Sequence, residues 1–165
     1  MAVANPSLET LVKQQLETVC DPEITTVSII DLGMVERVVV ENGKATVELL
    51  PTFLGCPALG IIKAQVERAL KQIRELEEVE VKYITSPPWT SDRITEKGKE
   101  GLKEFGIAPP PAKLEEDGTW EVACPYCGSK QSTMENIFGP SACRSIHYCK
   151  NCRNPFEAMK PIATM

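Results

Sequence analysis

The chain has 165 residues, of which 42% are hydrophobic and 25% are charged, and its formal net charge is −5. This composition suits one domain of ordinary size, or a small domain with a very small second one, and it excludes wholesale disorder. No apolar run approaches the ~20 residues needed to cross a bilayer, and the N-terminus lacks the basic and apolar regions of a secretory signal. We therefore expect a soluble cytoplasmic protein with no membrane role.

The chain contains seven cysteines, which is many for its length. In a reducing cytosol these residues would stay unpaired, so their spacing indicates metal binding or thiol chemistry. Residues 120–165 carry five basic side chains against three acidic ones. That excess is too small to indicate nucleic-acid binding and supports at most a mild attraction to an acidic partner surface.

The first part of the chain predicts helices and strands in alternation. A helix capped by Ser7 is predicted over 7–19, because apolar residues recur there at helical spacing. β-Branched runs over 38–50 flank Asn42-Gly43, the preferred pair for a tight I′ hairpin turn. A second helix is predicted over 57–74, with a proline in its first turn.

Residues 79–85 predict a third strand, and the prolines that follow end it. A weaker helix is predicted over 91–105, because Gly98 and Gly101 lower the helical propensity. The order helix, hairpin, helix, strand, helix predicts an α+β domain over residues 1–107, in which helices cover a small sheet.

Residues 108–119 contain three consecutive prolines followed by acidic residues, which predicts a stiff, solvated linker and a domain boundary. Beyond the linker, four cysteines have the spacing of a metal site. They form two C-x2-C pairs separated by 21 residues, namely Cys124 with Cys127 and Cys149 with Cys152. Two such turns direct four thiolates at one centre, which is the ligand set of a closed structural zinc site.

Residues 120–165 are too few for a large apolar core, so this segment would need the metal in order to fold. The strand-like stretches at 119–123 and 155–159 would then complete a zinc ribbon. A thioredoxin-like redox pair or an iron–sulfur cluster would use the same thiols, and both remain open alternatives. Between the pairs, Cys143 could be a further ligand or a buried small residue, and His147 a ligand or a surface or packing residue.

Cys56 stands alone between Gly55 and Pro57, where a strand pattern stops and a helix pattern begins. The amides and the positive dipole end of that helix would favour the thiolate, which lowers the thiol pKa and raises metal affinity. Cys56 could be a metal ligand, a nucleophile or a small residue that fills the junction. Asp21 and Glu23 could supply hard ligands for iron or orient a thiol, although an isolated Asp-Pro-Glu is usually a solvated turn.

The sequence lacks the motifs of several enzyme classes. His147 is the only histidine, and neither a G-x-S-x-G element nor a Gly-rich phosphate-binding loop is present. Because no acid–base constellation can be assembled from these residues, we expect an accessory factor without turnover of its own.

Several motifs together resemble a known family. CDPEI, IIDLGMV, LLPTFLGCP, SPPWTSD and GIAPP, in this order over about residues 8–110, resemble the small iron–sulfur assembly proteins that include SufT. With CPYCGS, FGPSAC and CKNCRNPFEAMK added, the whole chain resembles the PaaD-like (PaaJ) branch. Members of that branch are accessory proteins of the phenylacetyl-CoA epoxidase system, which acts in aerobic phenylacetate degradation.

The resemblance implies roles for the candidate residues. Cys56 matches the family thiol implicated in cluster or metal handling, and Asp21 and Glu23 match its Asp-Pro-Glu motif with a supporting role. Thr52 matches its Pro-Thr element, and Cys143 matches the cysteine of the FG-x-x-AC element. The four cysteines of the C-x2-C pairs match the ribbon of the PaaD-like branch.

Residues and resemblance together lead to a metal or iron–sulfur cluster maturation factor. Cys56 would bind iron or a cluster transiently, and the ribbon would hold a structural zinc and dock a partner. The implied partners are the oxygenase subunits, which have a di-iron centre, or the reductase subunit, which has an iron–sulfur cluster. Two copies could share one cluster as a homodimer. The alternatives are a structural subunit of the oxygenase assembly and a general iron–sulfur cluster assembly factor.

Overall fold

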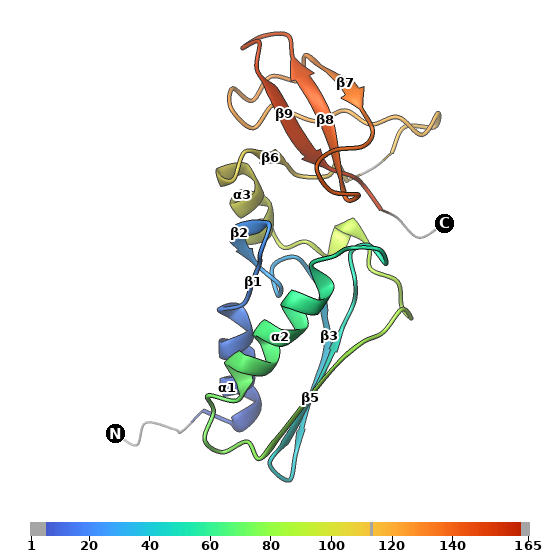
Figure 1. Ribbon diagram of the computed structural model, residues 1–165. Helices are drawn as coiled ribbons and strands as arrows, with labels where there is room; N and C mark the ends of the chain where they lie inside the picture. The colour runs from blue at the N-terminus through green and yellow to red at the C-terminus, as the bar shows by residue number, and fades with distance from the viewer. Residues whose placement is uncertain (1–5, 113, 163–165) are drawn as a thin grey trace.

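The structure, a computed structural model, describes residues 6–112 and 114–162. The molecule is elongated, with two helices and a three-stranded sheet towards one end and a four-stranded sheet at the other (Figure 1). Within the described residues, no helix is long and apolar enough to cross a membrane.

The three-stranded sheet has the order β3-β4-β5. β3 (Val35–Glu41) and β4 (Lys44–Leu49) pair antiparallel around a two-residue turn. Asn42 and Gly43 form this turn with φ of 48° and 75°, the left-handed values that a type I′ turn requires. The predicted hairpin is therefore confirmed. β5 (Glu78–Tyr83) lies parallel to β4 on its other side.

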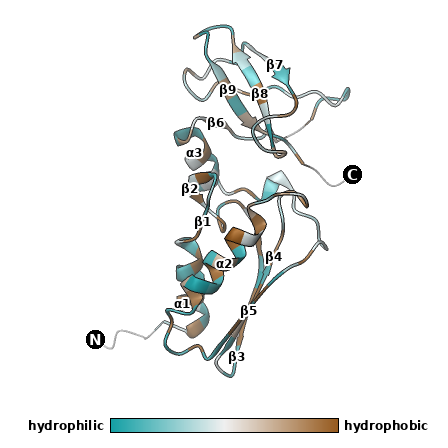
Figure 2. Ribbon diagram, in the orientation of Figure 1, coloured by the Kyte–Doolittle hydropathy of each residue, from teal (hydrophilic) through white to brown (hydrophobic). Residues whose placement is uncertain are grey.

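Two helices cover one face of this sheet, and apolar residues alternate with polar ones along both (Figures 1 and 2). α1 (Leu8–Glu17) begins where Ser7 accepts a hydrogen bond from the amide of Thr10. It ends before residue 19, since the hydroxyl of Thr18 donates to a carbonyl of the last turn. α2 (Leu59–Leu70) connects β4 to β5 and completes a β-α-β unit.

A two-stranded turn and a third helix follow the sheet towards the other domain. β1 (Cys20–Asp21) pairs with β2 (Ile24–Ser28), and α3 (Glu96–Glu104) packs against β2. The helix predicted over 91–105 is divided, because the 3-10 turn η1 (Ser91–Arg93) ends before Thr95 caps α3. The glycines that weaken this helix allow it to approach β2 closely.

The second sheet is the ribbon, with the order β6-β9-β8-β7. β6 (Ile107–Ala108) pairs parallel with β9 (Pro155–Met159), and β8 (Arg144–Cys149) pairs antiparallel with β9 and with β7 (Ser132–Asn136). The strand expected at 155–159 is β9.

The strand expected at 119–123 is wrong. These residues form no strand, because β6 and β7 occupy the positions at the two edges of the ribbon sheet. Val122 instead packs into the small ribbon core, and its carbonyl accepts a hydrogen bond from the side chain of Ser132. The α+β class with a C-terminal zinc ribbon is nevertheless confirmed.

The ribbon packs on the α+β domain as well as being joined to it in sequence. Ile107 of β6 and Met159 of β9 belong to the larger apolar core, which is otherwise formed by the helices and the first sheet. The amide and the hydroxyl of Ser91 both donate to the carbonyl of Ile162, at 2.8 and 3.0 Å. The junction between the domains is thus apolar on one side and hydrogen-bonded on the other.

Replacing Gly101 with alanine should lower the free energy of unfolding by about 1–3 kcal/mol, because the added Cβ overpacks the contact between α3 and β2. It would lie 2.7 Å from the carbonyl oxygen of Thr26. The control is Gly60→Ala in α2, where nothing lies within 4 Å and helical propensity improves. Urea unfolding of the two variants checks this, and equal effects would contradict the contact.

Candidate functional site

Two matching turns bring the four ribbon cysteines together. In the first, the amide of Gly128 donates to the carbonyl of Cys124 at 2.8 Å; in the second, the amide of Arg153 donates to that of Cys149 at 2.9 Å. Gly128 and Arg153 follow the second cysteine of their pairs and have φ of 73° and 60°. This left-handed residue turns the chain back, so that both sulfurs of a pair face the same side.

The sulfurs form a compact cluster, with one ligand atom per residue and all four within 4.8 Å of one another. The Sγ atoms of Cys124 and Cys152 are 3.7 Å apart, and those of Cys127 and Cys149 are 3.6 Å apart. Four sulfurs at the usual Zn–S distance of ~2.3 Å in a tetrahedron are separated by about 3.8 Å. The thiols therefore fit a tetrahedral metal ion.

The environments of the four thiols differ. A hydrogen bond from the amide side chain of Asn151, 3.6 Å away, and the backbone amide of Ser129 lower the pKa of Cys127 to about 6. Burial raises the pKa of Cys124 to about 11. A metal ion must therefore displace a proton from the buried thiol, while the exposed one is ready to bind at neutral pH.

His147 and Cys143 lie outside this cluster. The His147 side chain is buried, its Nε2 lies 2.9 Å from the hydroxyl of Ser145, and its ring stacks on Phe156. Burial also lowers the pKa of His147, as expected for a neutral packing residue. Cys143 lies in the loop before β8, with its sulfur 3.3 Å from the hydroxyl of Ser141.

Cys56 occupies the loop between β4 and α2 and is half-buried. Its amide donates to the carbonyl of Phe53 at 3.1 Å, and its own carbonyl accepts from the amide of Leu59, the first residue of α2, at 3.3 Å. The thiol thus lies at the N-terminal end of the helix, at the strand–helix junction that the sequence indicates.

The pKa of Cys56 is raised, contrary to the expectation from its place before a helix. Burial is the main cause, and the charges of Cys143, Asp21 and Glu23 raise it further, whereas only the amide of Ala58 opposes them. Pro57 has no N–H to add to that amide. The structure therefore brings these three candidate residues around Cys56 and makes the thiol dependent on a cation for its ionisation.

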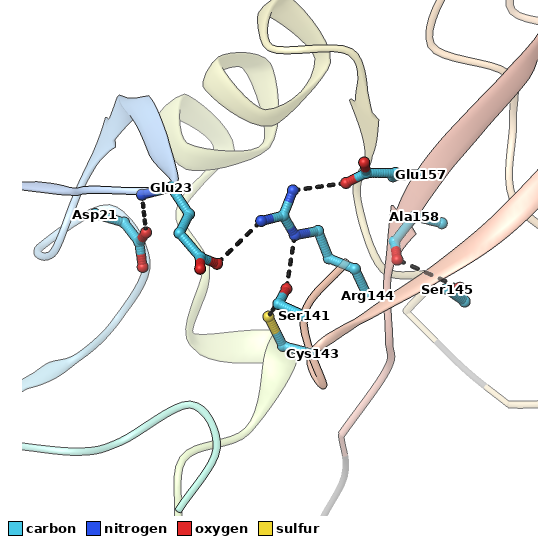
Figure 3. A network of polar contacts seen from close by, with 8 residues as sticks. All are labelled: Asp21, Glu23, Ser141, Cys143, Arg144, Ser145, Glu157 and Ala158. Atoms are coloured by element: carbon cyan, nitrogen blue, oxygen red, sulfur yellow. Dashed lines mark hydrogen bonds and ion pairs between the residues drawn. The ribbon is translucent and has the colours of Figure 1, made fainter. Parts of the chain in front are cut away.

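Asp21 and Glu23 lie in the turn between β1 and β2. An oxygen of Asp21 accepts a hydrogen bond from the amide of Glu23 at 2.7 Å, which fixes the turn, and burial raises the pKa of Asp21. The Glu23 carboxylate points away from it towards Arg144 of the ribbon, whose Nη2 is 3.1 Å away (Figure 3).

Thr52 and Cys20 lie beside this set. Thr52 is in the same loop as Cys56 and lines an apolar cavity of about 260 Å³ with Phe53, Leu54 and Trp89. Burial and the charges of Asp31 and Asp21 raise the pKa of Cys20. The charged residues that act on Cys20 therefore differ from those around Cys56, with Asp21 common to both.

Sequence reasoning missed three residues at this junction. Arg144 and Ser141 come from the ribbon, and nothing in the spacing of the motifs marks an arginine between two C-x2-C pairs as a partner of the Asp-Pro-Glu turn. Tyr83, at the end of β5, donates to the carbonyl of Leu59 at 2.8 Å. Burial and the charges of Cys56 and Asp21 raise its pKa, which places it near both.

An α+β domain that presents one thiol and two carboxylates, followed by a ribbon with four thiols, defines an iron–sulfur cluster assembly domain fused to a zinc ribbon. Residues 9–83 match the model of the iron–sulfur cluster assembly protein family, and residues 108–160 match that of the PaaD zinc beta ribbon domain. The chain belongs to the PaaD family, as its motifs predict.

Relatives cover most of the chain or its first domain. A protein of Escherichia coli (strain K12) that carries the name "Putative 1,2-phenylacetyl-CoA epoxidase", as one of the subunits, is 34% identical over 89% of each chain. "Fe-S protein maturation auxiliary factor SufT" of Staphylococcus aureus (strain USA300) is 39% identical over 51% of this chain and 96% of its own. The crystal structure of a domain of unknown function, DUF59, from Bacillus anthracis matches 58% of this chain and 92% of its own, with a TM-score of 0.54 and 35% identity.

Zinc affinity at the four thiols should fall as the pH falls, and more steeply below about pH 6. The Cys124 thiol, with a pKa of about 11, gives up a proton on binding throughout the neutral range, whereas Cys127, with a pKa of about 6, does so only when it is protonated. Competition with a chromophoric chelator between about pH 5 and 8 measures the slope.

Asn151→Ala should move this steepening to higher pH, because Cys127 loses the hydrogen bond that favours its thiolate. Cys143→Ser, outside the cluster, is the matched control and should leave the profile unchanged. A profile of constant slope in both the wild type and Asn151→Ala would contradict the assignment.

Proposed function

We propose that this protein is a maturation factor that holds iron or an iron–sulfur cluster at Cys56 and passes it to a client protein. One observation carries the proposal: the Cys56 thiol is half-buried at the junction of the two domains, with Cys143, Asp21 and Glu23 around it. A thiol together with carboxylates provides the soft and hard ligands that iron accepts.

The same surroundings make binding at Cys56 reversible. Among the described residues, only the four ribbon cysteines bring three or more potential ligands within 4.8 Å, so the ligands around Cys56 are looser. Its raised pKa means that the thiol must release a proton when a metal ion binds, and protons compete for the site at neutral pH. Such a site suits transfer of the cargo better than storage. Thr52, in the same loop, lies where it would border the incoming cargo.

In this proposal the ribbon holds a resident zinc ion through Cys124, Cys127, Cys149 and Cys152. Zinc has no redox chemistry, and a closed four-thiolate site leaves no position for substrate, so its role there is structural. The S···S separations of 3.6 and 3.7 Å support a single tetrahedral ion, and the pairing of the four thiols in one site speaks against a separate redox pair.

We further propose that the client is an oxygenase or reductase subunit of a phenylacetyl-CoA epoxidase. The support is the match, over 89% of both chains, to a relative named as a subunit of this enzyme, together with the match to the PaaD zinc ribbon. Relatives confined to the first domain are named as general maturation factors, which supports the handling of a cluster but not the choice of client. Two copies sharing one cluster would supply the ligands that a single Cys56 lacks.

Metal analysis of protein purified without oxygen tests the role of Cys56. After reconstitution, the wild type should contain zinc together with iron or with iron and sulfide, and Cys56→Ser should lose the iron and sulfide while its zinc is unchanged. Cys20→Ser is the matched control, because Cys20 is also half-buried but has other charged neighbours. Equal iron in all three proteins would refute the proposal.

Complementation identifies the client. In a strain without its own copy, the wild type should restore growth on phenylacetate and Cys56→Ser should not. Rescue by Cys56→Ser would instead favour a structural subunit. Normal growth of the deletion strain on phenylacetate, with loss of other iron–sulfur activities, would favour a general assembly factor.

A further inference from the structure

A buried arginine of the ribbon lies between the two domains. Arg144 is the first residue of β8, and only 6% of its surface is exposed. Its Nη2 donates to Glu23 of the Asp-Pro-Glu turn at 3.1 Å, and its Nη1 donates to Glu157 of β9 at 2.6 Å (Figure 3). A buried guanidinium is stable only when paired, so these contacts fix where it lies.

The third nitrogen of the guanidinium reaches the loop that carries Cys143. Its Nε donates to the hydroxyl of Ser141 at 2.9 Å, and that hydroxyl lies 3.3 Å from the sulfur of Cys143. All three nitrogens are therefore used, in three directions. One side chain holds a carboxylate of the first domain and, through Ser141, a thiol of the second.

We propose that Arg144 is a positioning residue that joins the ribbon to the cargo site and holds Glu23 and Cys143 in place beside Cys56. The proposal rests on the function proposed above and adds that the site is formed by both domains, so that the first domain alone is incomplete.

Charge around Cys56 supports this role. Asp21, Glu23 and Cys143 are the acidic groups whose charges act on Cys56, and Tyr83 borders it. Arg144 pairs with Glu23, and its charge also lowers the pKa of Asp21. Without the guanidinium, the Glu23 carboxylate would be free to turn into solvent, where it could not serve as a ligand.

The ribbon metal should control this arrangement. β8 runs from Arg144 to Cys149, and the second cysteine of that pair, Cys152, precedes β9, which carries Glu157. The metal therefore holds the end of the hairpin that presents Arg144 and Glu157 together. We expect the ribbon to be loaded first and the Cys56 site to become competent as a consequence.

The test uses the full-length protein loaded with zinc and measures Co²⁺ binding through the thiolate-to-cobalt absorption that depends on Cys56. Arg144→Gln should weaken this binding about tenfold or more, the usual cost of removing a residue that orients a metal ligand. Arg144→Lys keeps the charge but cannot make three directed contacts, so it should restore part of the affinity.

The matched control is Arg37→Gln. Arg37 makes a two-pronged ion pair with Glu48, at 3.0 and 2.8 Å, between β3 and β4 of the first sheet. It should bind Co²⁺ as the wild type does. Zinc content and thermal unfolding of each variant show whether the ribbon is intact, and Glu157→Gln, which removes only the ribbon partner, should have an intermediate effect.

The outcomes separate the two proposals. If Cys56→Ser and the wild type give the same cobalt spectrum, the proposed function fails. If the signal depends on Cys56 but Arg144→Gln binds within about twofold of Arg37→Gln, the positioning role is refuted while the proposed function stands, since a loss of one orienting contact normally costs more. A loss in Arg144→Gln with normal zinc content, partly restored by lysine, supports it.

Discussion

The four sulfurs within 4.8 Å of one another are the constraint on which the second half of the chain depends. Few apolar residues are buried inside the ribbon itself, and two of those are the metal-facing Cys124 and Cys149. So small a core cannot offset the entropy of ordering about fifty residues, and ligand bonds to a metal supply what burial does not. The turns at Gly128 and Arg153 aim the sulfurs, and the sheet extends outwards from them.

From this fixed end, the β8–β9 hairpin reaches the α+β domain and contributes to it. Met159 joins the larger core, and Arg144 pairs with the turn that holds Asp21 and Glu23. The Cys56 thiol lies at this junction, with a pKa raised by burial and by the acidic groups around it. Its readiness to bind a cation therefore depends on both domains, and the ribbon acts on the site as well as extending the surface for a partner.

The local elements could be predicted because their signals are local. Ser7 caps a helix, Asn42-Gly43 closes a hairpin, and the C-x2-C pairs converge, each through interactions a few residues long. The strand expected at 119–123 failed for a non-local reason: an extended, apolar stretch can pair only where an edge is free, and β6 and β7 occupy both edges. Gly98 and Gly101 read as helix-weakening residues, yet their small size allows α3 to approach Asp31 and Thr26.

The sequence by itself determined the class of fold, the four-thiol cluster and the family, because those depend on short spacings and on motifs that stand in order along the chain. Only the tertiary structure decided the character of Cys56 and the place of Arg144. A helix N-terminus lowers a thiol pKa, but burial and the charges of residues 21, 23 and 143 outweigh it, and their distance from Cys56 is set by domain packing. The pairing of Arg144 with Glu23 spans 121 residues, a separation at which no local pattern carries information.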